Sequence, residues 1–384
     1  MKKLFVTIVM LSVMIGCFSV GADAVSEDAI QIKAKSAVLM DASTGEVLYS
    51  FNENEKLYPA SVTKIMPLLL FMEALDSGKI SLEDTVTASP TAASKGGSQI
   101  WLKEGEQMTV DELLRATAIA SANDACTALG EHIAGSEVGF VKMMNDRAKE
   151  LGMTNTNFVN CSGLDDDTTE HLTTAYDIAL MSKELLFHDR IKTYTTVWMD
   201  SLRKGETQLV NTNKLVRFYS GTTGLKTGTT SKAGYCLSAS AERDGLHLIA
   251  VVMGAENSTD RFEGAKAMLD WGFANFETVT PQIDSSLFSQ VEVLRGVTES
   301  IRPVITGVVP LTLKAGEKSK IKTEISLSEN VEAPIEKNQT LGTVTLKIDD
   351  KEIARYNLVS DIFVEKTNIG HIMVRFLRSL AKSA

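Results

Sequence analysis

Hydrophobic and polar residues alternate with different periods along the chain, and these periods outline the expected elements. Near the start, residues 36–42 and 46–50 are β-prone runs joined by a short turn that contains glycine, a pattern typical of a β-hairpin. An apolar run from Ile65 to Leu75 follows, and its length predicts a helix. We therefore expect the hairpin to lead directly into this helix.

Helical spacing dominates the middle of the chain and gives way to strands at about residue 222. Thr109 stands three residues before Glu112, the arrangement of a capping box at a helix start. Asp244 and Gly245 are a pair typical of a tight hairpin. The other predicted elements are three helices, three strands and a last helix, over residues 124–133, 137–151, 173–187, 224–229, 235–241, 246–254 and 261–275. Strands, then helices, then strands predict one α+β domain in which helices cover a sheet.

A second domain is predicted beyond Pro281, where helix patterns vanish until about residue 366. Polar and apolar residues there alternate with the period of strands. The clearest runs cover residues 290–294, 320–325 and 343–348. Residues 281–365 hold no cluster of catalytic residue types, so we expect a small all-β domain that serves as a spacer or scaffold.

The first residues have the pattern of a targeting segment. Two lysines precede a long apolar run, and small residues at Ala22 and Ala24 occupy the positions that a signal peptidase recognises. This predicts a secretory signal peptide over residues 1–24 and therefore an exported protein. An alternative is cleavage before Cys17, which would then carry a lipid.

The last residues, 366–384, form an amphipathic pattern without an acidic residue. At 100° per residue the apolar side chains fall within an arc of roughly 140°. They are Ile369, Ile372, Met373, Phe376, Leu377 and Leu380, and the basic face opposite holds His371, Arg375, Arg378 and Lys382. The apolar run is too short to span a bilayer, so we expect a helix that lies in an anionic membrane surface. The alternative is a helix that docks on its own protein.

Composition narrows the function classes. A length of 384 residues favours two domains, and 44% apolar residues allow a sizeable core. The formal net charge of −10 and the pI near 5.2 make duplex nucleic acid an unsuitable partner. The five histidines are scattered without metal-ligand spacing, so we expect no metal and no cofactor.

The cysteines indicate core packing rather than chemistry. Cys17 lies within the predicted signal, and an odd number then remains, which argues against a disulfide framework. Cys126, Cys161 and Cys236 have small or apolar neighbours and are expected to be buried thiols. A catalytic cysteine is the alternative, but none stands in a nucleophile motif.

Candidate chemistry begins at the start of the helix that contains Ile65. Ser61 and Lys64 are three residues apart, which places them on one face of a helical turn. A serine hydroxyl needs a neighbouring base to become a nucleophile, and burial lowers the pKa of a lysine enough to make it one. The motif S-x-x-K is weak by itself, because it also occurs at Ser201, Ser319 and Ser379.

Two further motifs follow Ser61-x-x-Lys64 in a fixed order. Ser121-Ala122-Asn123 lies at the junction of two predicted helices, and Lys226-Thr227-Gly228 lies on a predicted strand. S-x-N recurs at Ser50 and Ser328, whereas Lys-Thr-Gly occurs once. The order and the structural setting of the three motifs together are therefore specific, although each short motif is weak.

The ordered set resembles the signature of penicillin-binding proteins and serine β-lactamases. More closely, the chain resembles the low-molecular-mass penicillin-binding proteins, which are serine-type D-alanyl-D-alanine carboxypeptidases. The likeness extends through the two domains and the terminal helix and includes residues 97–102, 158–164, 171–177 and 271–273. It implies a β-lactamase/transpeptidase-like α+β domain over 25–280, with an antiparallel sheet and a helical block.

The resemblance implies a role for each catalytic residue. Ser61 would become acylated, and Lys64 would accept its proton, although the base of this superfamily is disputed. Ser121 would relay a proton to the departing D-alanine. The backbone N–H groups of Ser61 and Thr229 would form an oxyanion hole. His171 is implied to be a loop residue near the site and not a base.

The resemblance also implies the residues that bind the substrate. Asn123 would bond the substrate amide, and Lys226 would attract the ionised substrate and keep Lys64 deprotonated. Thr227 would bond the terminal carboxylate, in the motif that Gly228 completes. Arg261 stands where the family has a carboxylate-binding arginine, and the alternative is a surface arginine at a helix start.

The implied function is removal of the terminal D-alanine from peptidoglycan stem peptides, in cell-wall remodelling, with β-lactams as inhibitors. The implied location is the outer face of the cytoplasmic membrane, or the cell wall. Three alternatives stay open: a β-lactamase, a transpeptidase and a non-catalytic penicillin-binding sensor or scaffold. Two features argue against a class A β-lactamase. Glu170 does not begin the E-x-x-L-N pattern of those enzymes, and Ala122 stands where their Ser-Asp-Asn motif has aspartate.

Overall fold

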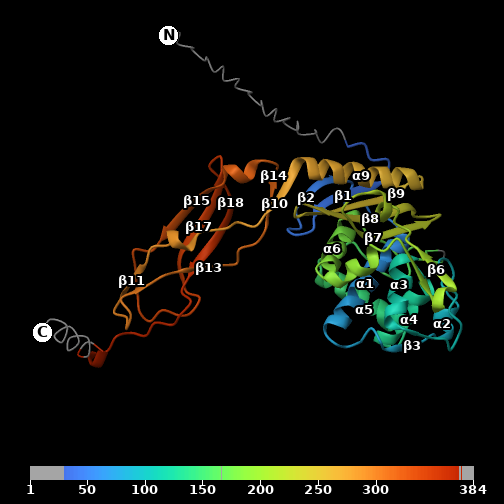
Figure 1. Cartoon of the computed structure of the whole chain (residues 1–384), viewed down its shortest axis with the longest axis horizontal. Helices are drawn as coiled ribbons and strands as arrows, with labels where there is room; N and C mark the ends of the chain where they lie inside the picture. Colours follow the sequence, from blue (N-terminus) through green and yellow to red (C-terminus); the bar gives the residue numbers. More distant parts are fainter. Residues whose placement is uncertain (1–29, 166, 372, 374–384) are drawn as a thin grey trace, which may run out of the picture.

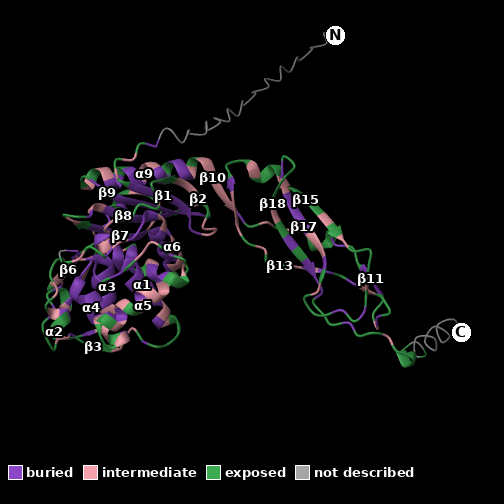
Figure 2. Ribbon diagram, turned by 180° about the vertical axis from the view of Figure 1, so that it is seen from behind, coloured by how far each residue is buried: buried purple, intermediate pink, exposed green. Residues whose placement is uncertain are grey.

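The computed structural model describes residues 30–165, 167–371 and 373. The predicted signal peptide over 1–24 and most of the predicted helix over 366–384 lie outside the described residues. Figure 1 shows a broad α+β part, built by the earlier residues, and a slender all-β part that extends from one side of it. Buried residues concentrate in the α+β part, whereas the all-β part is largely exposed or half-buried (Figure 2).

A five-stranded antiparallel sheet is the backbone of the α+β part, in the order β2-β1-β9-β8-β7. The strands are β1 (Ser36–Asp41), β2 (Val47–Phe51), β7 (Thr222–Thr230), β8 (Gly234–Arg243) and β9 (Leu246–Ala255). The pairing of β1 with β9 thus joins the first hairpin to strands β7, β8 and β9. No local sequence pattern specifies this pairing. Asp244 and Gly245 both have positive φ and form the tight turn expected between β8 and β9.

Helices cover both faces of this sheet (Figure 1). Helix α9 (Ser258–Asn275) packs on one face, and the helical block packs on the other. Successive residues of β1 point to opposite faces, as the strand period requires. Ala37 and Leu39 join the apolar cluster under α9, while Val38 and Met40 join the cluster shared with the helical block.

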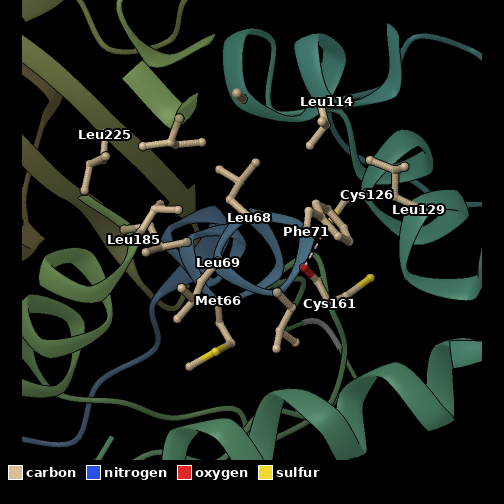
Figure 3. Close-up of a cluster of buried hydrophobic side chains, with 14 of the residues drawn as sticks. Met66, Leu68, Leu69, Phe71, Leu114, Cys126, Leu129, Cys161, Leu185 and Leu225 are labelled. Carbon is tan, nitrogen blue, oxygen red and sulfur yellow. Dashed lines mark hydrogen bonds between the residues drawn. The ribbon is translucent and has the colours of Figure 1, made fainter. Parts of the chain in front are cut away.

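The helical block surrounds α1 (Ile65–Asp76), which continues from the 3₁₀ turn η2 (Ala60–Lys64). Figure 3 shows apolar side chains of α1, among them Met66, Leu68 and Phe71, pointing outward in several directions into the core. The other helices are α2 (Pro90–Ala93), α3 (Val110–Ile119), α4 (Asn123–Ala134), α5 (Glu137–Glu150), α6 (Ala175–Leu186), α7 (Lys192–Thr195) and α8 (Leu215–Phe218). Two small antiparallel two-stranded sheets complete this part, β3 (Thr85–Thr87) with β4 (Gln107–Thr109), and β5 (Met199–Leu202) with β6 (Thr207–Val210).

The predicted capping box is present at the start of α3. The Thr109 hydroxyl accepts from Glu112 N at 3.2 Å, and the Glu112 carboxylate accepts from Thr109 N at 2.9 Å. Reciprocal bonds of this kind satisfy N–H groups that the first turn leaves without partners. They fix the entry of α3, whose other end leads to Ser121.

The all-β part contains β10 (Phe276–Val279) to β18 (Lys351–Val359). The strands between are β11 (Val291–Leu294), β12 (Ser300–Ile301), β13 (Val304–Thr306), β14 (Leu311–Lys314), β15 (Lys322–Leu327), β16 (Asn330–Glu332) and β17 (Thr340–Ile348). They form sheets in the orders β10-β14, β12-β11-β16 and β13-β18-β17-β15. The predicted fold class, an α+β domain followed by a small all-β domain, is confirmed. Within the described ranges, no helix has the length and apolar content needed to cross a membrane.

A buried carboxylate connects the two parts. Asp41, at the end of β1, accepts hydrogen bonds from the hydroxyls of Thr278 on β10 and Thr312 on β14, at 2.7 and 2.8 Å. Because Asp41 has no exposed surface, both bonds are shielded from water. They hold the β10–β14 pair against the first hairpin of the sheet.

Candidate active site

Ser61 and Lys64 lie together on η2, at the point where the chain enters the core. The Nζ atom of Lys64 is 2.9 Å from Ser61 Oγ and donates to the backbone carbonyl of Ser162 at 2.7 Å. Ser61 is half-buried, whereas Lys64 has no exposed surface. The sequence motif therefore forms the hydroxyl–amine contact that it predicts. Pro59 is the N-cap residue of η2.

Burial changes the acid–base behaviour of Lys64. It lowers the pKa of the amine to about 8, because desolvation disfavours the charged form more than the nearby Cys126, Cys161 and Asp124 favour it. In the part of the chain that the structure describes, no carboxylate forms an ion pair with Lys64. The amine is thus a base poised close to neutral pH.

Strand β7 brings the third motif against η2. At Gly228, a Cβ atom would lie 2.6 Å from the Pro59 carbonyl oxygen and 2.9 Å from Ser61 N, so only glycine permits this approach. Thr229, the next residue, is exposed. Thr227 is buried, and its hydroxyl donates to Thr212 Oγ1 at 2.7 Å.

Lys226, on the same strand, is a second buried amine. It is 1% exposed and donates to the Thr227 carbonyl at 3.1 Å. Burial is the largest cause that lowers its pKa, and the charges of Lys64 and Arg261 lower it further. Two neighbouring buried amines oppose each other's protonation, so the site without substrate disfavours charge on both.

The second motif supplies unpaired polar atoms. Ser121 has a φ of 65° at the turn between α3 and α4, and its buried hydroxyl has no hydrogen-bond partner among the described residues. Asn123 donates through Nδ2 to Gly96 O and through its backbone N to Ser98 O, both at 2.7 Å. Its Oδ1 atom is buried and lacks a partner in the described structure. Buried polar groups without partners are costly, and a bound substrate would satisfy them.

Arg261 is not the surface arginine of the alternative interpretation. It is 7% exposed, and its Nη1 atom donates to Gly228 O and Thr229 Oγ1, both at 3.1 Å, and to Cys236 O at 3.3 Å. The guanidinium therefore supports the end of β7 from behind. That surface interpretation was wrong because the side chain of Arg261 faces β7 and β8, where it is shielded from solvent.

His171 serves the structure, as expected. It is fully buried, its Nδ1 atom accepts from Val159 N at 3.1 Å, and Nε2 lies 2.8 Å from Thr63 Oγ1. Since Nδ1 accepts, Nε2 carries the proton and donates. Burial, followed by the charge of Lys64, lowers the pKa of His171 to about 4, so the ring is neutral at pH 7.

Two further predictions concern the environment of the cysteines and the presence of metal ligands. Cys126, Cys161 and Cys236 are buried free thiols in the structure. No group of three or more His, Cys, Asp or Glu residues with the geometry of a metal site occurs in the ranges described.

Sequence reasoning missed the backbone partners that hold the site. The carbonyl of Ser162, which accepts from Lys64, is set by a turn that begins at Asn160. The spacing of Asn160 and Gly163 was a turn signal that could have indicated it. Asp124, buried beside Asn123, accepts from the N–H groups of Ile100 and Leu102 and thereby holds the loop next to Asn123.

Comparisons with known proteins agree with this fold. A family model described as D-alanyl-D-alanine carboxypeptidase matches residues 22–257, and a model of the C-terminal domain of penicillin-binding protein 5 matches residues 276–366. The chain is 44% identical over 362 residues to the D-alanyl-D-alanine carboxypeptidase DacF of Bacillus subtilis, covering 92% of each chain. It is 36% identical to the carboxypeptidase DacC of Escherichia coli, covering 86% of this chain and 84% of that one.

Solved structures extend the comparison to three dimensions. Penicillin-binding protein 5 of Haemophilus influenzae matches with a TM-score of 0.78 and 34% identity, over 88% of this chain and 98% of that one. The ampicillin-bound penicillin-binding protein D2 of Listeria monocytogenes matches with a TM-score of 0.59 and 32% identity, over 64% of this chain and 99% of that one.

The fold and site thus define a serine-type peptidase of the penicillin-binding class. The chain belongs to the D-alanyl-D-alanine carboxypeptidase family. Its activity is serine-type D-alanyl-D-alanine carboxypeptidase activity.

The close approach at Gly228 generates a prediction. The substitution Gly228→Ala should lower the rate of acylation by a fluorescent penicillin at least about tenfold, because the added carbon would push β7 away from Ser61 N. Gly264→Ala, on α9, is the matched control, since an added Cβ there would lie 3.6 Å from Ile32, its nearest neighbour outside the helix backbone. The control should acylate like the parent protein. Equal rates for Gly228→Ala and the parent would contradict the account of this contact.

Proposed function

We propose that Ser61 is the nucleophile that removes the terminal D-alanine from peptidoglycan stem peptides through an acyl-enzyme. The single observation that supports this most strongly is the 2.9 Å contact between Ser61 Oγ and a fully buried Lys64 amine. A hydroxyl beside a base of matched pKa is the arrangement that nucleophilic catalysis requires.

In the proposed acylation step, Lys64 takes the hydroxyl proton as Ser61 Oγ attacks the carbonyl carbon of the penultimate D-alanine. The resulting oxyanion lies between the backbone N–H groups of Ser61 and Thr229. Ser61 is in the first turn of η2, where an N–H has no partner within the helix, and β7 approaches it at Gly228. One such donor is worth about 3 kcal/mol of the activation barrier.

The C–N bond of the tetrahedral intermediate then breaks, and the nitrogen of the leaving D-alanine needs a proton. The proposed route runs from the ammonium of Lys64 through the hydroxyl of Ser121, whose lack of a partner leaves it available. Water completes the cycle by hydrolysing the ester on Ser61, with Lys64 again accepting the proton. Asn123 holds the substrate amide through its unpaired Oδ1 atom, which accepts an N–H.

Recognition of the substrate carboxylate is assigned to Lys226, Thr227 and Arg261. The low pKa of Lys226 reflects burial without a counter-ion, and a substrate carboxylate supplies that counter-ion. Substrate binding would therefore favour the charged form of Lys226. That charge in turn favours the neutral form of Lys64, so recognition and activation of the base are coupled. Arg261 contributes from behind through Thr229.

β-Lactams fit the same proposal as acylating inhibitors, because the relative from Listeria monocytogenes is described as ampicillin-bound. The proposed setting is outside the cell, where the substrate lies, and it rests on the signal pattern over 1–24. The amphipathic pattern over 366–384 supports attachment to the outer face of the membrane.

The nucleophile is tested by Ser61→Ala. A peptide that ends in D-Ala-D-Ala should release D-alanine with the parent protein and not measurably with the variant, and only the parent should be labelled by a fluorescent penicillin. Ser201→Ala, in another S-x-x-K segment, is the control and should behave like the parent. Unchanged D-alanine release by a folded Ser61→Ala variant would reject the assignment.

The buried amine predicts a pH dependence. Lys64 accepts a proton only when neutral, and its pKa is lowered to about 8. The acylation rate should rise with pH through this value and level off above it, with a tenfold fall per pH unit on the acidic side, to about pH 6. Stopped-flow acylation between about pH 6 and pH 9.5 measures the curve. A rate that stays flat over this range would show that another group accepts the proton.

Membrane attachment is tested by deletion of residues 366–384. Flotation with vesicles that contain about 30% anionic lipid should recover the full-length protein and lose the truncated one, because the tail supplies both apolar area and positive charge. Vesicles of zwitterionic lipid should bind the full-length protein more weakly. Equal flotation of the truncated protein would assign binding to another surface.

A further inference from the structure

The carbonyl of Ser162 restricts the direction in which Lys64 presents its lone pair. A neutral amine has two N–H donors and one lone pair, and the lone pair must face Ser61 Oγ to accept the proton. One N–H of Lys64 donates to Ser162 O at 2.7 Å, and Ser61 Oγ lies 2.9 Å from the same nitrogen. Rotation of the amine is therefore limited by the position of a single backbone carbonyl. This reasoning rests on the proposed role of Lys64 as base.

A single side chain, Asn160, shapes the turn that carries this carbonyl. Its Oδ1 atom accepts from Ser162 N at 3.1 Å, from Gly163 N at 2.7 Å and from Ser162 Oγ at 3.2 Å. Its Nδ2 atom donates to Leu164 O at 2.7 Å. An asparagine that bonds the backbone two and three residues ahead replaces the backbone bonds that would otherwise close such a turn. The side-chain amide of Asn160 thus bonds to backbone groups on both sides of the Ser162 carbonyl, whose oxygen accepts from Lys64.

The turn has little room to shift. Gly163 has a φ of +87°, and a Cβ atom there would lie 1.8 Å from the carbonyl oxygen of Ala60, the residue before Ser61. On the other side, Cys126 Sγ donates to Cys161 O at 3.4 Å. The turn is therefore wedged between the start of η2 and helix α4. Because the turn is closely packed on both sides, a small change in its shape would move the Ser162 carbonyl and thereby the amine of Lys64.

We infer that Asn160 is a positioning residue for the general base: it fixes the Ser162 carbonyl, which in turn aims the amine of Lys64 at Ser61. Asn160 acts through the backbone and does not itself touch the reacting atoms. The residue belongs to none of the three motifs. Its effect should appear in the chemical step, where the lone pair must be aligned, and not in substrate binding.

The first test compares Asn160→Ala with Asn157→Ala. Asn157 is an exposed asparagine of the same segment, whose side chain makes one bond, from Nδ2 to Glu170 O at 2.9 Å, away from the amine. Asn160→Ala should lower the acylation rate and the kcat for D-alanine release about 10- to 100-fold, the range expected for misalignment of a reacting group. KM should stay within about threefold, because the carboxylate-binding residues are untouched. Asn157→Ala should match the parent protein in all three quantities.

The second test uses Asn160→Asp, which keeps the acceptor for both backbone N–H groups, loses the donor to Leu164 O and adds a negative charge. The turn should persist, and the charge should favour the ammonium form of Lys64. The acidic limb of the acylation pH profile should therefore move to higher pH, with activity recovered on the alkaline side. Asn160→Ala should remain slow at every pH. Such a shift would show that position 160 acts on Lys64 across the turn, while the split between kcat and KM in the first test separates positioning from structural support.

Three results would overturn the inference. They are an Asn160→Ala variant that acylates at the parent rate, a loss that lies wholly in KM, or an Asn160→Asp profile with an unshifted limb. If near-UV circular dichroism shows that Asn160→Ala is not folded, Asn160→Ser takes its place under the same limits, since a serine hydroxyl keeps one acceptor for the turn. Failure of Ser61→Ala to abolish labelling would instead reject the proposed function, so the two failures are distinguishable.

Discussion

The site depends on the burial of two lysine amines, for which the described residues supply no paired carboxylate. Lys64 and Lys226 are 0% and 1% exposed, and each would need a counter-charge to remain protonated at no cost. Their pKa values fall mainly because water is excluded. The described part of the fold thus produces a base near neutral pH without an acidic partner, and in the proposed mechanism the substrate carboxylate completes the charge balance.

Burial of these amines requires close backbone packing around them. Strand β7 reaches η2 only because Gly228 has no side chain, and the 160–163 turn reaches Ala60 only because of Gly163. Helix α1, which continues directly from η2, packs its apolar side chains in the core (Figure 3). Peptide groups therefore form part of the site, among them the Ser162 carbonyl and the N–H of Ser61 beside Gly228.

The all-β part remains a predicted spacer or scaffold. It meets the first hairpin through Asp41, on the edge of the sheet that is remote from β7. It extends away from the helical block, and its last described residues lie at its far tip (Figure 1). Such a spacer would separate a site that acts on the cell wall from a terminal segment that binds a membrane.

The sequence by itself determined the elements whose signals are local: the first hairpin, the capped helix at Thr109, the tight turn at Asp244 and the period-two strands of the second domain. It also indicated Ser61 and Lys64, because three residues of helical spacing bring them together. Only the tertiary structure decided the pairing of β1 with β9, the burial of Arg261 and the role of the Ser162 carbonyl. These features depend on contacts between segments far apart in the chain. The spacing of Asn160 and Gly163 could indicate a turn, but a backbone carbonyl has the same chemistry at every residue, so the sequence does not show that this one accepts from Lys64.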